Sequence, residues 1–194
     1  MKKKIISIAL VVAMIAIIAA GSFAYFTDTK QADNTLTVGN VKIELTEPSW
    51  NTNGNESDDV YPGEALPKDP TVKNVGDNPC FVRVKVAGLD CLGEENMITY
   101  ETNYVKGALG EGWELGADGY FYYTKVLGTD ETTTTALFDQ IRIPKTVTNG
   151  FDADAYDVVV TAQAVQAQGA KSSWAAVQSM TVAEIAAWFT TCGM

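Results

Sequence analysis

Short runs of alternating apolar and polar residues, separated by turn-forming Gly, Pro, Asn and Asp, recur between residues 35 and 167. A period of two places apolar side chains on one face of a strand, so these runs predict half-buried β-strands. The clearest run is residues 80–86, where Val82, Val84 and Val86 share one face. Further strands are expected at residues 35–45 with a kink at Gly39-Asn40, at 71–75, 136–143 and 156–167, and in a hairpin across Asp118-Gly119.

Many short strands joined by turns predict an all-β fold, an antiparallel sandwich of jelly-roll or Greek-key type. Residues 50–70 are expected to be mostly irregular, because three prolines and an acidic stretch interrupt them. The chain changes character near its end, where Thr181 and Glu184 have the spacing of a capping box. A short C-terminal helical region is therefore expected within residues 171–190.

The first 24 residues have the order of a signal peptide. A basic start is followed by an uncharged apolar run and then by the small residues Ser22 and Ala24. That order is typical of a segment that a signal peptidase removes. We expect a signal-peptide helix within residues 1–24 and cleavage between Ala24 and Tyr25.

The remaining residues, 25–194, are expected to form one domain that is exported to the cell surface or the extracellular matrix. Residues 25–34 are expected to be a flexible N-terminal segment. The alternative for the N-terminus is a retained membrane anchor, because the uncharged stretch from residue 5 to 27 is long enough to span a bilayer. The only membrane contact expected is through the uncleaved signal peptide.

The sequence contains no histidine and has a formal net charge of -10. Without imidazole, this sequence offers no His-ligated zinc site and no Ser-His or Cys-His catalytic pair, so we predict no enzymatic activity. The excess of acidic residues repels phosphate backbones, so nucleic acid is not an expected partner.

Two blocks of residues carry a family resemblance. The first is residues 24–29 (AYFTDT) together with residues 34–43, and the second lies within residues 67–84. Here the chain resembles the TasA/camelysin family of exported Gram-positive proteins, many of which depend on a signal peptidase of the SipW type. Weaker similarity extends to about residue 167, and residues 168–194 have no counterpart.

The resemblance implies a jelly-roll sandwich and, for the TasA branch, assembly into the extracellular matrix fibres of a biofilm. It also implies that the freed N-terminal segment of one subunit pairs with the sheet of the next, which is strand addition. The residues themselves leave a disordered tail as the alternative, because the segment is polar. The donor would run from residue 25 to about residue 34 and begin with Tyr25, Phe26, Thr27, Asp28 and Thr29.

The camelysin branch has been assigned a zinc-dependent protease activity, and this sequence departs from it. The motif His-Glu-x-x-His is impossible without histidine. The favoured prediction is therefore a self-associating structural protein. The alternative is an exported monomeric binding or adhesion module on the same fold.

Oxygen-bearing side chains crowd the loop from Asn51 to Asp59. Calcium prefers such ligands, but the spacing differs from that of the twelve-residue calcium loop. A solvated acidic loop is the preferred prediction, with calcium as the alternative, and no other cofactor is expected.

Three cysteines leave at least one unpaired within the chain. We predict three free thiols. The alternatives are a disulfide between Cys80 and Cys91, and an intermolecular disulfide through Cys192.

Three further features have no assigned chemistry. Arg83 is expected to be an exposed charge on its strand, with an ion pair to a neighbouring strand as the alternative. Of the four aromatic residues 120–123, two are expected in the core and two on a surface for lateral packing. The C-terminal helix is expected to cover a sheet edge or one end of the sandwich.

Overall fold

The computed structural model describes residues 40–52, 61–93, 96–130, 132–147 and 157–194. All of them lie in one compact unit, Gly39–Met194. No helix in these ranges has the length and hydropathy needed to cross a membrane.

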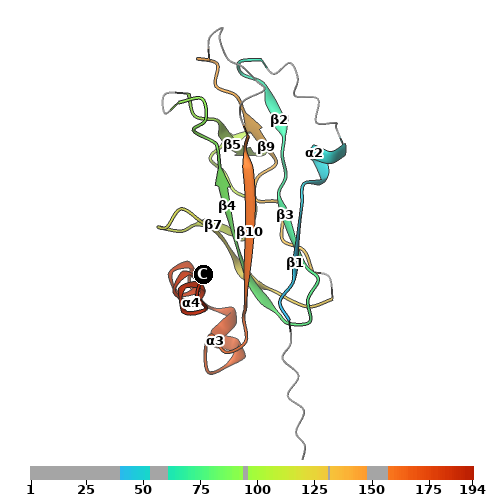
Figure 1. Ribbon diagram of the computed structural model, residues 1–194, viewed down its shortest axis with the longest axis vertical. Helices are drawn as coiled ribbons and strands as arrows, with labels where there is room; N and C mark the ends of the chain where they lie inside the picture. Colours follow the sequence, from blue (N-terminus) through green and yellow to red (C-terminus); the bar gives the residue numbers. More distant parts are fainter. Residues whose placement is uncertain (1–39, 53–60, 94–95, 131, 148–156) are drawn as a thin grey trace, which may run out of the picture. The chain divides into compact units, whose positions relative to one another are not determined.

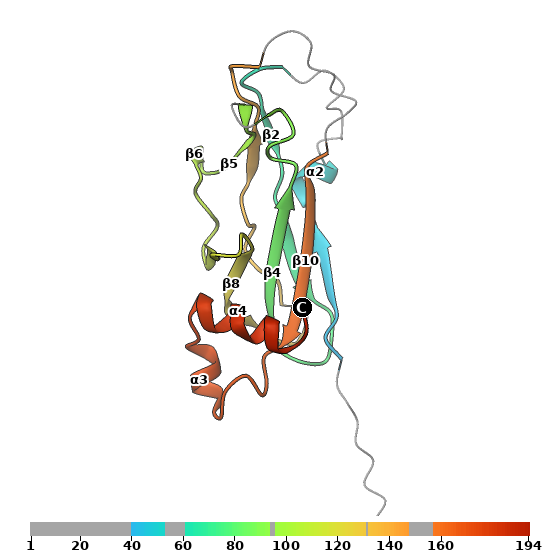
Figure 2. The same cartoon turned by 60° about the vertical axis from the view of Figure 1, so that its left-hand side comes forward.

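One layer of the fold is a four-stranded antiparallel sheet with the order β10-β4-β8-β7 (Figures 1 and 2). Its longest pairing joins β4 to β10 over eight residues, with Val84 opposite Ala162. β7 and β8 form the hairpin predicted across Asp118-Gly119. The strand bounds are β4 Cys80–Ala87, β7 Trp113–Leu115, β8 Phe121–Leu127 and β10 Val159–Gln166.

The second layer combines two antiparallel sheets, one of four strands in the order β2-β9-β5-β6 and one of two strands, β1-β3. Backbone hydrogen bonds outside the strands join them, including Thr134 N to Val72 O at 2.9 Å and Leu137 N to Pro70 O at 2.9 Å. The strand bounds are β1 Ile43–Thr46, β2 Ala65–Pro67, β3 Thr71–Asn74, β5 Thr99–Thr102, β6 Val105–Lys106 and β9 Gln140–Arg142.

The chain crosses repeatedly from one layer to the other. It passes from β3 to β4, returns to β5, crosses again before β7, returns after β8 and crosses once more to β10, ahead of the C-terminal helices. Crossings between two antiparallel sheets are typical of Greek-key and jelly-roll sandwiches. The predicted all-β sandwich with a short C-terminal helix is confirmed.

The main core lies between the layers. Val82 and Val84 from β4 face inward, and Val160, Ala162 and Ala164 from β10 pack against the same cluster. This confirms the alternation predicted for both strands. The Tyr100 ring of β5 connects the layers, because it stacks on Phe138 and meets Phe121 of β8 edge-on, with ring centroids 5.6 Å apart in both pairs.

A second core lies on the outer face of the four-stranded sheet, under two helices (Figure 2). These are α3 (Trp174–Gln178) and α4 (Val182–Thr191). Phe189 of α4 and Phe81 of β4 are both fully buried in this core. The helices therefore cover the outer face of the sheet at one end of the sandwich, where Trp188 Nε1 donates to Gln166 O, and not a sheet edge.

The capping box predicted at Thr181 is confirmed. The Thr181 side chain accepts a hydrogen bond from Glu184 N, and the Glu184 carboxylate accepts one from Thr181 N at 2.9 Å. These bonds satisfy amides that the first turn of a helix leaves free.

Arg83 is buried, so its predicted exposure on the strand is wrong. Its guanidinium carbon lies 4.0 Å from the Tyr120 ring centroid and 4.5 Å from that of Phe189. Its Nε donates to Gln163 Oε1 at 2.8 Å, and its Nη1 donates to the Tyr122 hydroxyl at 3.3 Å. The charge is buried because α4 covers this side of the sheet.

The same helices correct the prediction for the aromatic run. Phe121 and Tyr123 lie in the main core, which confirms the prediction for two of the four, whereas Tyr122 is buried in the second core and Tyr120 is half-buried against it. None of the four forms the exposed surface that we expected, because α4 occupies that face.

Two further predictions differ from the structure. Between residues 50 and 70, the described part contains β2 and the end of a short helix, α2 (Pro48–Thr52). The strand predicted over residues 35–45 is seen only as β1, which begins at Ile43, and residues 35–39 lie outside the described ranges.

Candidate functional site

Two edge strands from different layers, β1 and β10, lie side by side (Figures 1 and 2). β1 pairs only with β3, and β10 pairs only with β4. Among the described residues, no strand hydrogen-bonds to the other edge of either one. An unpaired edge offers backbone amides and carbonyls to an incoming strand.

A groove of about 260 Å³ lies between the end of β1 and the start of β10, and Thr46, Glu47 and Lys68 supply the polar part of its lining. Leu45 of β1, Val160 of β10 and the preceding Val158 supply its apolar surface, and all three also pack against the main core. They face the groove because the period of two directs alternate residues toward the space between the layers. The apolar wall can accept side chains of an added strand, while the free edges can accept its backbone.

A buried ion pair borders the groove. The Lys68 ammonium lies 3.0 Å from both carboxylate oxygens of Glu47, and Lys68 is only 5% exposed. It also lies 4.9 Å from the centroid of the Trp50 ring. Glu47 Oε2 accepts a hydrogen bond from Lys68, whereas Oε1 is buried without one and is held by charge alone. Removing either partner would leave a buried charge uncompensated, so the pair fixes this border of the groove.

The site residues predicted from the sequence lie outside the described residues. These are the cleavage position, Ala24 and Tyr25, and the donor residues Tyr25, Phe26, Thr27, Asp28 and Thr29. Sequence reasoning missed the groove itself, because it arises where β1 and β10 meet and has no local signature.

Most of the predicted calcium loop, residues 53–60, also lies outside the described ranges. Among the described residues, no three His, Cys, Asp or Glu side chains come together in a way that could hold a metal ion. The calcium alternative stays a prediction.

The three cysteines are free in the structure. Cys80 is buried in the main core, and its burial raises the pKa of the thiol to about 12. Cys91 is half-buried and Cys192 is exposed at the end of α4. This agrees with the prediction of free thiols and not with a Cys80–Cys91 disulfide.

Comparison with known proteins gives one match. The model of the family described as camelysin metallo-endopeptidase matches residues 1–80. This confirms the resemblance to the TasA/camelysin family. No curated protein and no solved structure matches the chain significantly.

The family description names a metallo-endopeptidase, which would need side chains able to ligate zinc. Catalytic zinc is held by three protein ligands, usually with histidine among them. The sequence has no histidine, and the described residues contain no cluster of three alternative ligands. The described residues do not fit such a centre.

Proposed function

We propose that this protein is an exported structural protein that assembles into extracellular fibres, as a biofilm matrix or cell-surface subunit. The observation that carries the proposal is the groove between the unpaired edges of β1 and β10, which both apolar and polar side chains line. The camelysin family match supports it, because the resemblance to the TasA branch implies fibre assembly.

In this proposal, residues 25–34 of one copy add to the β1–β10 groove of the next. Ten extended residues reach about 33 Å, and the eight residues of β10 extend over about 26 Å, so the donor is long enough for the whole strand. Backbone hydrogen bonds supply affinity, and alternate donor side chains meet Leu45, Val158 and Val160. Cleavage after Ala24 by a signal peptidase of the SipW type would release the donor.

The direct test is electron microscopy of residues 25–194 beside residues 35–194. Fibres from the longer chain and none from the shorter one would support N-terminal strand addition. Replacing Tyr25 and Phe26 with Asp in the longer chain should also abolish fibres. An unchanged fibre yield in that variant would remove the donor role.

The acceptor side has a matched pair of variants. Val160→Lys places a charge in the groove, whereas Val159→Lys places one on the opposite, solvent-facing side of the same strand, where Val159 is 51% exposed. We expect loss of fibres only for Val160→Lys, with thermal melting used to confirm that both variants fold. Equal fibre formation by the two folded variants would argue against this groove.

The second candidate is an exported monomeric binding module on the same fold. It is favoured by a larger groove, of about 550 Å³, on the outer face of the second layer. Sedimentation of residues 25–194 over a range of concentrations separates the candidates, because a binding module stays monomeric.

We propose no peptidase activity for the chain, since its sequence has no histidine to ligate zinc. The test is incubation of the purified protein with an unfolded protein substrate, with and without added zinc. Zinc-dependent cleavage that a chelator abolishes would overturn this part of the proposal.

A further inference from the structure

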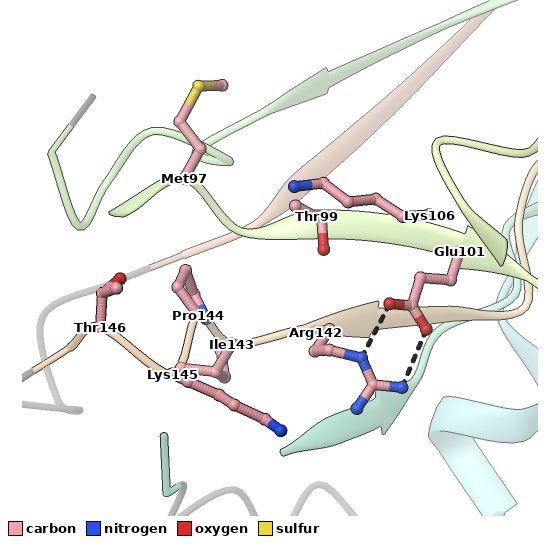
Figure 3. Close-up of a pocket in the computed structure, with 9 residues that line it drawn as sticks. All are labelled: Met97, Thr99, Glu101, Lys106, Arg142, Ile143, Pro144, Lys145 and Thr146. Carbon is pink, nitrogen blue, oxygen red and sulfur yellow. Dashed lines mark hydrogen bonds and ion pairs between the residues drawn. The ribbon is translucent and has the colours of Figure 1, made fainter. Parts of the chain in front are cut away.

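The larger groove lies over β5 and β9 (Figure 3), and the alternation of the strands places it on the face away from the main core. Tyr100 and Ile141 point into the core, so their sequence neighbours in these strands point outward. The strand register places Arg142 opposite Thr99, and Lys106 opposite Glu101. A patch of charged side chains is therefore built into the outer surface of regular strands.

A bidentate ion pair forms the floor of the groove. Arg142 Nε lies 2.7 Å from Glu101 Oε1, and Arg142 Nη2 lies 2.9 Å from Glu101 Oε2. Arg142 Nη1 donates to Gly63 O at 3.1 Å, which holds the guanidinium in place. The hydrogen bond from Arg142 lowers the pKa of Glu101, so this carboxylate stays charged and fully engaged.

Two lysines make no direct contact of this kind, although the charge of Lys106, opposite Glu101, also helps to lower the pKa of that carboxyl. Lys106 and Lys145 also line the groove, and within the described ranges neither makes an ion pair or a side-chain hydrogen bond. In Figure 3 their ammonium groups lie on either side of the Arg142 side chain. Three basic side chains thus face one carboxylate, in a chain whose formal net charge is -10.

The rest of the lining is mostly apolar. Met97, which is 48% exposed, lies with Ile143 and Pro144 along the groove. None of the described residues that line it is aromatic, so the groove lacks the flat ring on which a sugar would stack. Cations beside aliphatic surface suit a peptide that carries both carboxylates and apolar side chains.

We propose that this groove binds a short acidic peptide segment of a partner protein. Carboxylates of the partner pair with Lys106 and Lys145, and its apolar side chains contact Met97 and Pro144. Arg142 is not expected to pair with the partner, because Glu101 already occupies its guanidinium. The inference does not depend on the proposed fibre assembly, because the groove is separate from β1 and β10.

The test measures binding of a fluorescent peptide in which Glu and Val alternate, with a Gln-Val peptide as its uncharged match. We expect the purified protein to bind only the Glu peptide. Replacing either lysine with Gln should weaken binding by about two- to fivefold, the usual effect of losing one contact between exposed charges. Raising the salt from about 50 to about 500 mM should weaken it further, because screening shortens the reach of exposed charges.

Lys125→Gln is the matched control, because Lys125 is an exposed lysine on β8 that already pairs with Glu111. Its peptide affinity should equal that of the unchanged protein. Equal affinity of the Lys106→Gln, Lys145→Gln and Lys125→Gln variants would overturn the site, as would equal binding of the Gln-Val peptide. Binding of an oligogalacturonate but not of the Glu peptide would overturn the assignment to a peptide partner.

Discussion

The buried side chain of Arg83 makes several interactions at once. Its planar guanidinium lies between the Tyr120 and Phe189 rings and donates to Gln163 and Tyr122. Asp118 forms a long ion pair with it, with a carboxylate oxygen 3.9 Å from Nη1. A guanidinium can stack and donate at the same time, whereas an ammonium is a compact point charge.

We therefore expect both Arg83→Leu and Arg83→Lys to lower the free energy of unfolding by about 1–3 kcal/mol, because each leaves buried polar groups without partners. Urea denaturation followed by circular dichroism measures the change. Lys125→Leu is the control, since its pair with Glu111 is exposed and should matter little. A lysine variant as stable as the unchanged protein would refute the importance of stacking.

The cysteines should differ sharply in reactivity. Cys80 is buried, and its thiol pKa of about 12 leaves almost no thiolate near neutral pH, whereas Cys192 is exposed. We expect iodoacetamide to label Cys192 quickly and Cys80 only after unfolding, as read by peptide mass spectrometry. Rapid labelling of Cys80 in the folded protein would contradict its position in the core.

Among the elements, α4 has the most extensive stabilising contacts at its N-terminus. Besides the capping box, the Lys171 ammonium lies 2.7 Å from Glu184 Oε1. The hydrogen bond from Lys171, followed by those from Thr181, lowers the pKa of Glu184 from 4.5 to about 2. The charged carboxylate is thus the form that favours the folded helix.

Stability from Glu184 should be fully present above about pH 4.5 and be lost as the pH falls toward 2, because the folded pKa is the lower one. The Glu184→Gln variant should lack this part of the acid dependence. The melting temperatures of the variant and of the unchanged protein should therefore differ near neutral pH and become equal in acid. Melting temperatures across this pH range measure it. Parallel pH profiles for the two proteins would contradict the assignment.

Thr181→Ala removes the other half of the capping box. It should cost about 0.5–2 kcal/mol, the usual range for loss of a helix cap. Urea denaturation measures the cost, and Thr190→Ala near the exposed C-terminal end of α4 is the control. Equal losses in the two variants would mean that the cap contributes nothing specific.

Strong local signals explain which elements the sequence predicts. The alternation in β4 and β10 and the capping box of α4 each lie within a few neighbouring residues, and all three are confirmed. The β5–β6 hairpin was missed because Asn103 and Tyr104 form its turn. Both adopt positive φ, at 52° and 64°, without the glycine that usually marks such a turn.

Tertiary context explains what the sequence could not predict. Pro48 follows the end of β1, where proline would be expected to stop a strand, but proline also suits the first turn of a helix, and α2 begins there. The burial of Arg83 depends on α4, which lies about a hundred residues further along the chain. The β1–β10 groove likewise depends on where two distant strands meet.

At the scale of the whole molecule, α3 and α4 add a third layer to a two-layer sandwich. Beneath them, Phe81 and Tyr122 are fully buried on a sheet face that would otherwise meet water. A surface of this kind, once exposed, favours association between molecules.

Deleting residues 171–194 should therefore cause self-association that does not depend on the N-terminal segment. Size-exclusion chromatography with light scattering should detect it in chains that also lack residues 1–34. Deleting only residues 192–194, which are exposed, is the control and should leave the protein unchanged. A truncated chain that stays folded and monomeric would show that the helices do not protect this face.

The eight-residue pairing of β4 with β10 also has a mechanical consequence. A tensile load applied along β10 would act in shear on the whole ladder, so its hydrogen bonds would resist together. Pulling across the strands would instead break them one pair at a time. If load passes between subunits through β10, the strongest direction of each subunit lies along this strand.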